Sequence, residues 1–193
     1  MMRNFFLYSA ALFLLLIAGL VILRIFARRS YRDHGRLTPT IAFIQALLFF
    51  VYGGFPTFYL PKTWPDVDAQ PWLHGIGLAM LVIGLGFLFS GIFQLSLRSS
   101  VGRGAPVLKW RGMYSVSRNP QALACGLYVL GFAILWPSGY AAGWALLYPI
   151  LIHTMILTEE EHLARLYAQD YLDYCQQVPR YLGRRKPRSH SDD

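Results

Sequence analysis

Long apolar runs constrain the fold of this chain more than any other feature of its sequence. Residues 5–23 carry no charged side chain, and a helix of that length crosses the roughly 30 Å hydrocarbon core of a bilayer. Similar runs occupy residues 38–60, 72–97, 120–136 and 139–157. In lipid, only helices and closed barrels satisfy their own backbone hydrogen bonds. We therefore predict an all-α membrane bundle with about five transmembrane helices.

The composition supports one membrane domain over residues 1–193. The chain is 55% hydrophobic and 15% charged, whereas soluble domains carry about 25% charged residues. We expect three N-terminal spans in 1–97, a core with a helical hairpin in 98–183, and a basic disordered tail in 184–193. The first run exceeds the apolar core of a signal peptide and lacks a small-residue cleavage site, which favours an uncleaved helix.

The distribution of basic residues predicts the orientation of the bundle. Residues 24–37 carry five arginines, residues 98–119 carry five basic side chains and no acid, and the tail contains RRKPR. Basic loops mark the cytoplasmic side, so the net charge of +8 indicates topology rather than nucleic-acid binding. We expect a bacterial-type inner or plasma membrane, with the N-terminus outside and the active site and C-terminus in the cytoplasm.

Two other patterns are interpreted structurally. Gly77, Gly84 and Gly91 recur every seven residues, and such stripes allow helices to approach closely in lipid. Cys125 and Cys175 lack the spacing of a zinc or redox motif. We therefore predict helix packing at the glycines and no metal site.

The first polar cluster, RGMYSVSRNP at 111–120, precedes the fourth apolar run. Pro120 suits the first turn of a helix, and Asn119 suits the N-cap position before it. A helix N-terminus can also hold a polar or anionic ligand. Arg118 is either part of such a site or an ordinary cytoplasmic anchor.

The second polar cluster, at 158–183, follows the fifth apolar run and begins with three glutamates. The pattern predicts an amphipathic helix that ends before Pro179, with an apolar face formed by Leu163, Leu166, Tyr167, Tyr171, Tyr174 and Val178. An interfacial helix with a solvated acidic face explains the tyrosines. It leaves Glu159 and Glu160 unexplained, and ionisable groups at that depth are functional candidates.

A tight hairpin brings the two polar clusters to one membrane face. Pro137 and Ser138 alone separate the fourth and fifth runs, so the far ends of both helices return to the same side. Arg118 and Asn119 are therefore expected beside Glu159 and Glu160. His153, inside the fifth run, serves either as a base in a tunnel or as a bond to a neighbouring helix.

This pair of motifs resembles the isoprenylcysteine carboxyl methyltransferase and phospholipid N-methyltransferase superfamily of membrane methyltransferases. The first motif matches at Gly112, Tyr114, Arg118, Asn119, Pro120 and Gly126, and the second at Glu159, Glu160 and Leu163, followed by Tyr167, Tyr171, Tyr174 and Val178-Pro179. The resemblance covers residues 105–183, so the core in 98–183 is methyltransferase-like. The first three spans resemble the family only in being transmembrane helices, without a matching motif.

The resemblance implies S-adenosylmethionine as methyl donor, S-adenosylhomocysteine as product, and a lipid or lipophilic acceptor that enters from the membrane. It implies catalytic roles for Glu160 and Arg118. The cofactor-binding residues that it implies, together with Gln121 as a substitute contact, are Gly112, Tyr114, Arg118, Asn119, Pro120, Gln121, Gly126, Glu159, Glu160, Tyr171 and Tyr174.

Three departures from the family pattern keep the acceptor open. Asn119 stands where carboxyl methyltransferases have histidine, Ala122 stands where a tyrosine is common, and no arginine lies one turn before the glutamates. An amine lipid or small hydrophobic molecule is therefore expected at least as much as an isoprenylcysteine-like carboxylate. The alternatives are a non-catalytic membrane protein with an assembly or binding role and a small transporter. Oligomeric state stays open.

Overall fold

The computed structural model describes residues 2–58, 70–101 and 112–183, and these residues form helices and short connections. The elements are α1 (Met2–Leu20), a π-helical turn (Val21–Phe26), α2 (Ala27–His34), α3 (Pro39–Gly54), a 3₁₀ turn (Phe55–Phe58), α4 (Pro71–Val101), a 3₁₀ turn (Gly112–Ser115), α5 (Pro120–Leu135) and α6 (Gly139–Gln177). The predicted all-α membrane bundle is confirmed. The predicted disordered tail, 184–193, lies outside the described residues.

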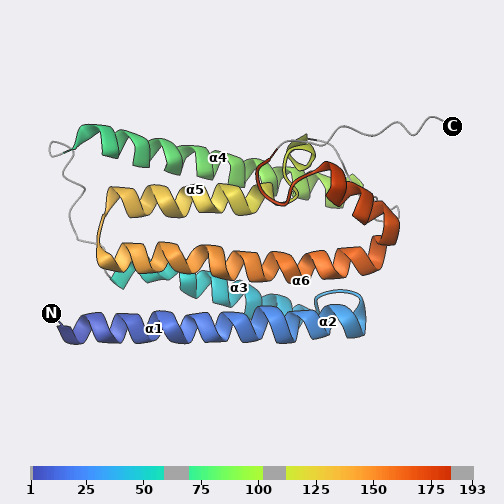
Figure 1. Ribbon diagram of the computed structural model, residues 1–193, viewed down its shortest axis with the longest axis horizontal. Helices are drawn as coiled ribbons and strands as arrows, with labels where there is room; N and C mark the ends of the chain where they lie inside the picture. The colour runs from blue at the N-terminus through green and yellow to red at the C-terminus, as the bar shows by residue number, and fades with distance from the viewer. Residues whose placement is uncertain (1, 59–69, 102–111, 184–193) are drawn as a thin grey trace.

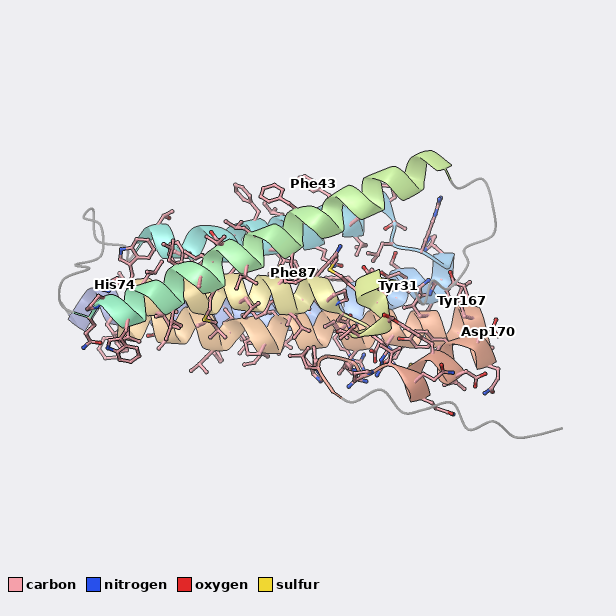
Figure 2. All side chains as sticks on the ribbon, turned by 90° about the horizontal axis from the view of Figure 1, so that it is seen from above. Tyr31, Phe43, His74, Phe87, Tyr167 and Asp170 are labelled. Atoms are coloured by element: carbon pink, nitrogen blue, oxygen red, sulfur yellow. The ribbon has the colours of Figure 1, made fainter. Side chains whose placement is uncertain are left out.

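Three helical segments are long and apolar enough to cross a bilayer: Phe5–His34, Pro39–Thr57 and Gly139–Gln177. Two shorter apolar helices, Pro71–Phe87 and Pro120–Leu135, accompany them. The long helices lie roughly parallel, with α6 between the α4–α5 pair and the α1–α3 group (Figure 1). In Figure 2, Tyr31, Tyr167 and Asp170 gather at one end of this bundle and His74 lies at the other. We call the first of these the polar end.

The first helix is longer than the sequence predicted. The segment 24–37 was expected to be a loop, but helix continues from Phe5 through a π-helical turn to His34, and Gly35 ends it with a φ of 66°. Arg24 and Arg28 explain the difference, because both guanidinium groups bind Glu161 of α6, at 2.6 and 2.7 Å. The two arginines lie where the helix leaves the bilayer, and Glu161 neutralises them there. The chain can therefore stay helical instead of forming a loop.

The fifth span and the amphipathic tail were predicted as separate helices, but α6 joins them into 39 residues. Its part before Ala168, residues 139–167, is about 44 Å long at 1.5 Å per residue, more than the roughly 30 Å hydrocarbon core, so the end of this part projects beyond the membrane. Ala168 interrupts the helix with φ 45° and ψ −118°. This kink turns residues 169–177 back across the end of the α5–α6 hairpin (Figure 1).

Replacing Ala168 by glycine is expected to stabilise the protein by about 1 kcal/mol. A positive φ costs a residue with a Cβ about 1–3 kcal/mol, which exceeds the extra chain entropy that glycine loses on folding. Thermal unfolding in detergent measures the change. Ala164→Gly, in regular helix of the same segment, serves as the control and is expected to destabilise by about 1 kcal/mol; equal losses in both variants would contradict the strain.

Glycines let α4 and α5 pack with their backbones almost in contact. A Cβ on Gly84 would lie 2.8 Å from both Ala124 O and Tyr128 N, and a Cβ on Gly131 would lie 2.7 Å from Gly77 O. The predicted packing role of Gly77 and Gly84 is confirmed. Gly91 lies outside the part of α4 whose side chains are described.

Gly84→Ala is expected to lower the free energy of unfolding by about 1–3 kcal/mol, because backbone rather than a mobile side chain occupies the space. Gly86→Ala is the matched control, since a Cβ there meets nothing within 4 Å. Thermal unfolding of both variants in the same detergent gives the comparison. Equal melting temperatures would show that α4 and α5 separate easily.

A reciprocal pair of side chains fixes α6 against α3. The Trp144 indole donates to the Tyr52 carbonyl at 2.9 Å, the Tyr52 hydroxyl donates to the Trp144 carbonyl at 3.2 Å, and the rings stack 5.3 Å apart. Trp144 is fully buried. This pair therefore anchors the first turns of α6 to the end of α3.

Candidate functional site

The site is built where residues 178–183 cross the start of α5. After α6 ends, Pro179 accepts a backbone hydrogen bond from Arg118 N at 3.0 Å. The Arg180 carbonyl accepts from Asn119 Nδ2 at 3.1 Å and from Ser117 Oγ at 3.4 Å. The first polar motif is thus tied to the chain's last described segment, about sixty positions later.

Glu160 binds two arginines, Arg118 just before α5 and Arg180 just after α6. Its Oε1 lies 3.1 Å from Arg118 Nη1, and its Oε2 accepts from Arg180 Nε at 2.9 Å and lies 2.7 Å from Nη2. The Arg118 and Glu160 side chains are only 12% and 11% exposed. We call these three residues the carboxylate–arginine cluster. The expected meeting of the two motifs is confirmed for Arg118 and Glu160.

The cluster retains unused hydrogen-bonding capacity. Glu160 Oε1 is in ionic contact with Arg118 but accepts no aligned hydrogen bond, and Arg118 Nε has no partner among the described residues. Arg118 Nη1 instead donates to Cys175 Sγ at 2.7 Å. Buried polar atoms without partners are costly. A ligand with both hydrogen-bond donors and acceptors would satisfy them.

Asn119 occupies the N-cap position of α5, but its side chain makes no capping bond. The amide is engaged by Arg180 O, and Ser117 Oγ accepts from the Asn119 backbone N–H at 3.1 Å. The predicted position is right and the predicted capping mechanism is wrong. The reason is the returning segment, which offers a carbonyl that the sequence motif alone does not reveal.

Two tyrosines of the turned-back helix close the cluster from the polar end. Tyr171 and Tyr174 are 3% and 5% exposed, and the Tyr174 hydroxyl donates to Tyr114 O at 2.8 Å. Burial raises the pKa of Tyr174 to about 12, although the Arg118 guanidinium opposes the shift. Burial also raises the pKa of the Cys175 thiol. Both groups stay protonated at neutral pH. Leu166, predicted on the same face, is 52% exposed, whereas Leu163 and Tyr167 pack against Tyr171, Tyr174 and Val178.

The three consecutive glutamates point to different partners. Glu161 binds Arg24 and Arg28, Glu160 belongs to the carboxylate–arginine cluster, and Glu159 borders a small cavity with Tyr31 and Thr158. Successive helical residues are 100° apart, so the split follows from helix geometry. Glu159 was predicted to lie with Glu160 beside Arg118, and the structure places it on the α1–α3 side instead.

The remaining predicted residues surround the same place. Gly112 has a φ of 68°, which favours glycine, and starts the 3₁₀ turn that carries Tyr114. Pro120 and Gln121 form the first turn of α5. Gly126 lies farther along α5, in the wall of an apolar cavity, where a Cβ would contact Tyr148 at 3.4 Å.

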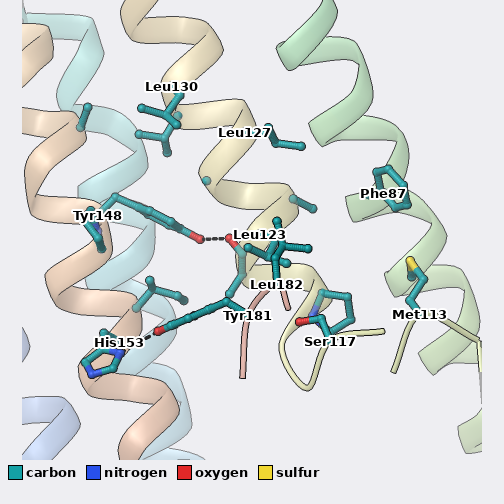
Figure 3. Close-up of a pocket in the computed structure, with 18 of the residues that line it drawn as sticks. Phe87, Met113, Ser117, Leu123, Leu127, Leu130, Tyr148, His153, Tyr181 and Leu182 are labelled. Carbon is teal, nitrogen blue, oxygen red and sulfur yellow. Dashed lines mark hydrogen bonds between the residues drawn. The ribbon is translucent and has the colours of Figure 1, made fainter. Parts of the chain in front are cut away.

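This cavity has a volume of about 860 Å³ and lies between α4, α5 and α6 (Figure 3). Its walls are almost wholly apolar, and Leu130 and Leu146 at its rim are 50% and 69% exposed. It begins at Ser117 and Pro120, beside the carboxylate–arginine cluster. A volume in this range suits a small-molecule or lipid ligand.

Sequence reasoning missed Arg180, Tyr181 and Ser117. Tyr181 lines the cavity and lies 2.7 Å, through its hydroxyl, from His153 Nδ1. A basic and an aromatic residue directly after Pro179 were the available signal, because a proline that ends a helix often redirects the chain.

Comparison with known proteins gives one family match. A family model described as phospholipid methyltransferase matches residues 72–170, which include α4 without its first residue, all of α5 and most of α6. No curated protein and no solved structure matches. The matched range contains Arg118 and Glu160 and stops before Tyr171 and Arg180.

Proposed function

The chain belongs to the phospholipid methyltransferase family, and on that premise we propose that it transfers a methyl group from S-adenosylmethionine to a lipophilic acceptor. The observation that carries this proposal is the carboxylate–arginine cluster. Two motifs that lie 42 positions apart meet there, at the mouth of an apolar cavity. A polar donor and a lipophilic acceptor can therefore approach one another at a single place.

The residues of the cluster fit the polar groups of this cofactor. The Glu160 carboxylate accepts hydrogen bonds from an ammonium group or from ribose hydroxyls, and the Arg118 guanidinium binds a carboxylate. Both side chains carry a buried atom without a hydrogen-bond partner among the described residues. Arg180 already neutralises the other oxygen of Glu160. Arg118 and Glu160 have opposite charges, so a zwitterionic amino-acid group adds no net charge to this buried pair, while Arg180 is 36% exposed to solvent.

The surrounding residues have supporting roles in the proposed site. Tyr171 and Tyr174 exclude water, Asn119 fixes residues 178–183 over the start of α5, and Gly112 shapes the turn that carries Tyr114. Gly126 borders the acceptor side. Glu159 faces the α1–α3 side of α6, so we leave it out of the proposed cofactor contacts.

Catalysis in this arrangement rests on positioning. When bound, the cofactor supplies an electrophilic methyl group on a sulfonium centre. Arg118 and Glu160 hold the polar part at the end of the cavity, and the cavity walls align the acceptor. Correct orientation of two reactants accounts for much of an enzymatic rate enhancement. Half-buried side chains on α5 and α6 provide the rigidity that such orientation needs.

The site is proposed to face the cytoplasm. The polar end carries Arg24, Arg28 and the first polar motif, and basic residues gather on the cytoplasmic side. A cytoplasmic opening gives access to S-adenosylmethionine, while the apolar cavity gives access to the bilayer. Labelling of single engineered cysteines at the polar end by an impermeant reagent in intact cells tests this topology.

The proposed function is tested by adding S-adenosylmethionine to the full-length protein in detergent and in lipid nanodiscs. We expect calorimetric binding at micromolar concentration, and transfer of labelled methyl groups into a membrane lipid extract. Folded protein that binds no cofactor would exclude a methyltransferase. Cofactor binding without transfer to any lipid would favour the alternative, a non-catalytic binding role.

A further inference from the structure

The two atoms of the carboxylate–arginine cluster that have unused hydrogen-bonding capacity are closed off from solvent. Glu160 Oε1 and Arg118 Nε are both buried atoms, and their side chains are only 11% and 12% exposed. A molecule with the polar groups of S-adenosylmethionine cannot reach them while the contacts around them hold. Binding at this cluster therefore requires part of its cover to move.

The helices beside the cluster are anchored by apolar packing. α5 and α6 contribute Val129, Tyr148 and Leu151 to the main hydrophobic core. The turned-back end of α6 contributes Tyr171 and Tyr174 to a second apolar cluster. Moving either helical part would expose buried apolar side chains to water, which is unfavourable. These parts of the cover are therefore expected to stay in place.

Residues 178–183, which we call the returning segment, lack such an anchor beyond Val178. The segment has no regular secondary structure, and none of its residues after Val178 is buried. Its backbone is held by hydrogen bonds from residues 117–119 to the Pro179 and Arg180 carbonyls. Segments with few buried apolar contacts open locally at a small cost in free energy. The returning segment can thus open while both apolar clusters persist.

Two neighbouring side chains of this segment bind to two different sites. Arg180 lies against Glu160 in the carboxylate–arginine cluster, with 2.7 Å between Nη2 and Oε2. The Tyr181 hydroxyl is hydrogen-bonded to His153 Nδ1 at 2.7 Å (Figure 3), and Tyr181 and Leu182 line the apolar cavity. Because these residues are consecutive, a movement that frees one site also frees the other.

We propose that residues 178–183 form a lid, that this lid opens to let the cofactor enter and leave, and that a chain in the apolar cavity holds it closed. The inference rests on the proposed methyltransferase function and adds how its site is opened. Tyr181 is a positioning residue, since its hydroxyl bonds to His153 and acts on the cofactor site only through the backbone of the lid.

The lid gives each of its two positions a role. When open, it exposes Glu160 and Arg118 to the aqueous phase and admits the cofactor. When closed, it excludes water from the cluster and completes the cavity wall with Tyr181 and Leu182. An acceptor chain packed against that wall stabilises the closed position, so an occupied cavity slows cofactor release. Donor and acceptor are thereby kept together during transfer.

The first test needs no cofactor. The Arg118 N–H donates to the Pro179 carbonyl of the lid, so its hydrogen exchanges with solvent when the lid opens. Tyr181→Phe keeps the ring and removes one hydrogen bond of the lid. We expect this variant, as full-length protein in nanodiscs, to exchange the Arg118 amide about fivefold faster. The Leu123 amide, bonded to Asn119 O within the first turn of α5, should exchange at the wild-type rate.

The second test follows S-adenosylhomocysteine binding to the same nanodiscs by surface plasmon resonance. The lid closes over both the empty and the occupied site. Tyr181→Phe should therefore raise the association and dissociation rates by about the same fivefold and leave the dissociation constant within about twofold. A change that merely damages the site would raise the dissociation rate alone and weaken binding.

Tyr148→Phe is the matched control for both tests. Tyr148 lines the same cavity and its hydroxyl donates to Ala122 O at 2.6 Å, so the substitution also removes one phenol hydrogen bond. Tyr148 belongs to α6, however, and not to the lid. The exchange rate of the Arg118 amide and the binding rates of S-adenosylhomocysteine are expected to match those of the wild type.

Dodecane, a chain without a head group, tests the control of the lid by the cavity. In wild-type nanodiscs it should slow the release of S-adenosylhomocysteine several-fold. Gly126→Leu places a larger side chain in the cavity wall and should abolish this effect. Release that is equally fast with and without dodecane would overturn the link between the cavity and the lid.

The outcomes separate the lid from the function on which it rests. Equal Arg118 exchange in the wild type and Tyr181→Phe would overturn the lid, whatever the cofactor does. Faster exchange with unchanged S-adenosylhomocysteine rates would overturn cofactor entry through the lid and leave the methyltransferase standing. Folded wild-type protein that binds no S-adenosylhomocysteine would refute the methyltransferase and the role of the lid together, even if residues 178–183 open.

Discussion

Glu160→Gln is expected to weaken S-adenosylmethionine binding by about 100-fold, because two charge-assisted hydrogen bonds of about 1.5 kcal/mol each are lost. The same change leaves Arg118 and Arg180 without their shared anion. Removal of one partner from a buried ion pair costs about 3–5 kcal/mol, so the melting temperature should fall as well. Calorimetry and thermal unfolding in the same detergent measure the two effects.

Glu161→Gln is the matched control for this prediction. Glu161 is the next residue of α6 and also binds two arginines, but Arg24, Arg28 and Glu161 have side chains 32% to 54% exposed. Exposed pairs contribute about 0–1 kcal/mol, so cofactor affinity and stability should hardly change. If Glu161→Gln weakens binding as much as Glu160→Gln, the loss reflects general distortion of α6 and the cofactor site must lie elsewhere.

Hydropathy and motif spacing predicted the parts of this protein that obey local rules. A span in lipid needs a continuous apolar run, so α3, α5 and the first half of α6 were recognisable from composition. Pro137 and Ser138 permit only a tight hairpin, and that hairpin is what brings Arg118 to Glu160. Within the apolar run 38–60, α3 ends at Gly54 and a 3₁₀ turn follows at Phe55–Phe58.

The remaining features depend on contacts that no local pattern encodes. Ala168 is an ordinary helix former, and its positive φ accompanies contacts made after it: Tyr171 and Tyr174 pack back on Leu163 and Tyr167, and the Tyr174 hydroxyl donates to Tyr114 O. That packing returns Arg180 and Tyr181 to α5. Helical phase also separates Glu159 from Glu160, although in sequence they form one motif. Sequence patterns therefore identified the first polar motif and the glutamates, but they did not identify Arg180 and Tyr181, which the returning segment brings to the same place.

Gly126→Leu is expected to lower methyl transfer to a long-chain acceptor by at least about tenfold while cofactor affinity stays within about twofold of wild type. A Cβ on Gly126 fits against the Tyr148 ring at 3.4 Å. The rest of the leucine side chain must then extend into the apolar cavity that Gly126 borders. Steady-state transfer with lipids of graded chain length measures the effect, and the longest chains should lose most.

Gly86→Leu is the control, because a Cβ at Gly86 has no described atom within 4 Å and Gly86 is exposed on the outside of α4. Its transfer rates should equal those of the wild type. The variant at Gly126 also distinguishes two roles for that residue. Loss of cofactor affinity with unchanged preference among chain lengths would place the cofactor against Gly126, as the family resemblance implies. Loss of long-chain transfer alone would place the acceptor there, because only a molecule that extends along α5 past Gly126 can be excluded by a blocked cavity.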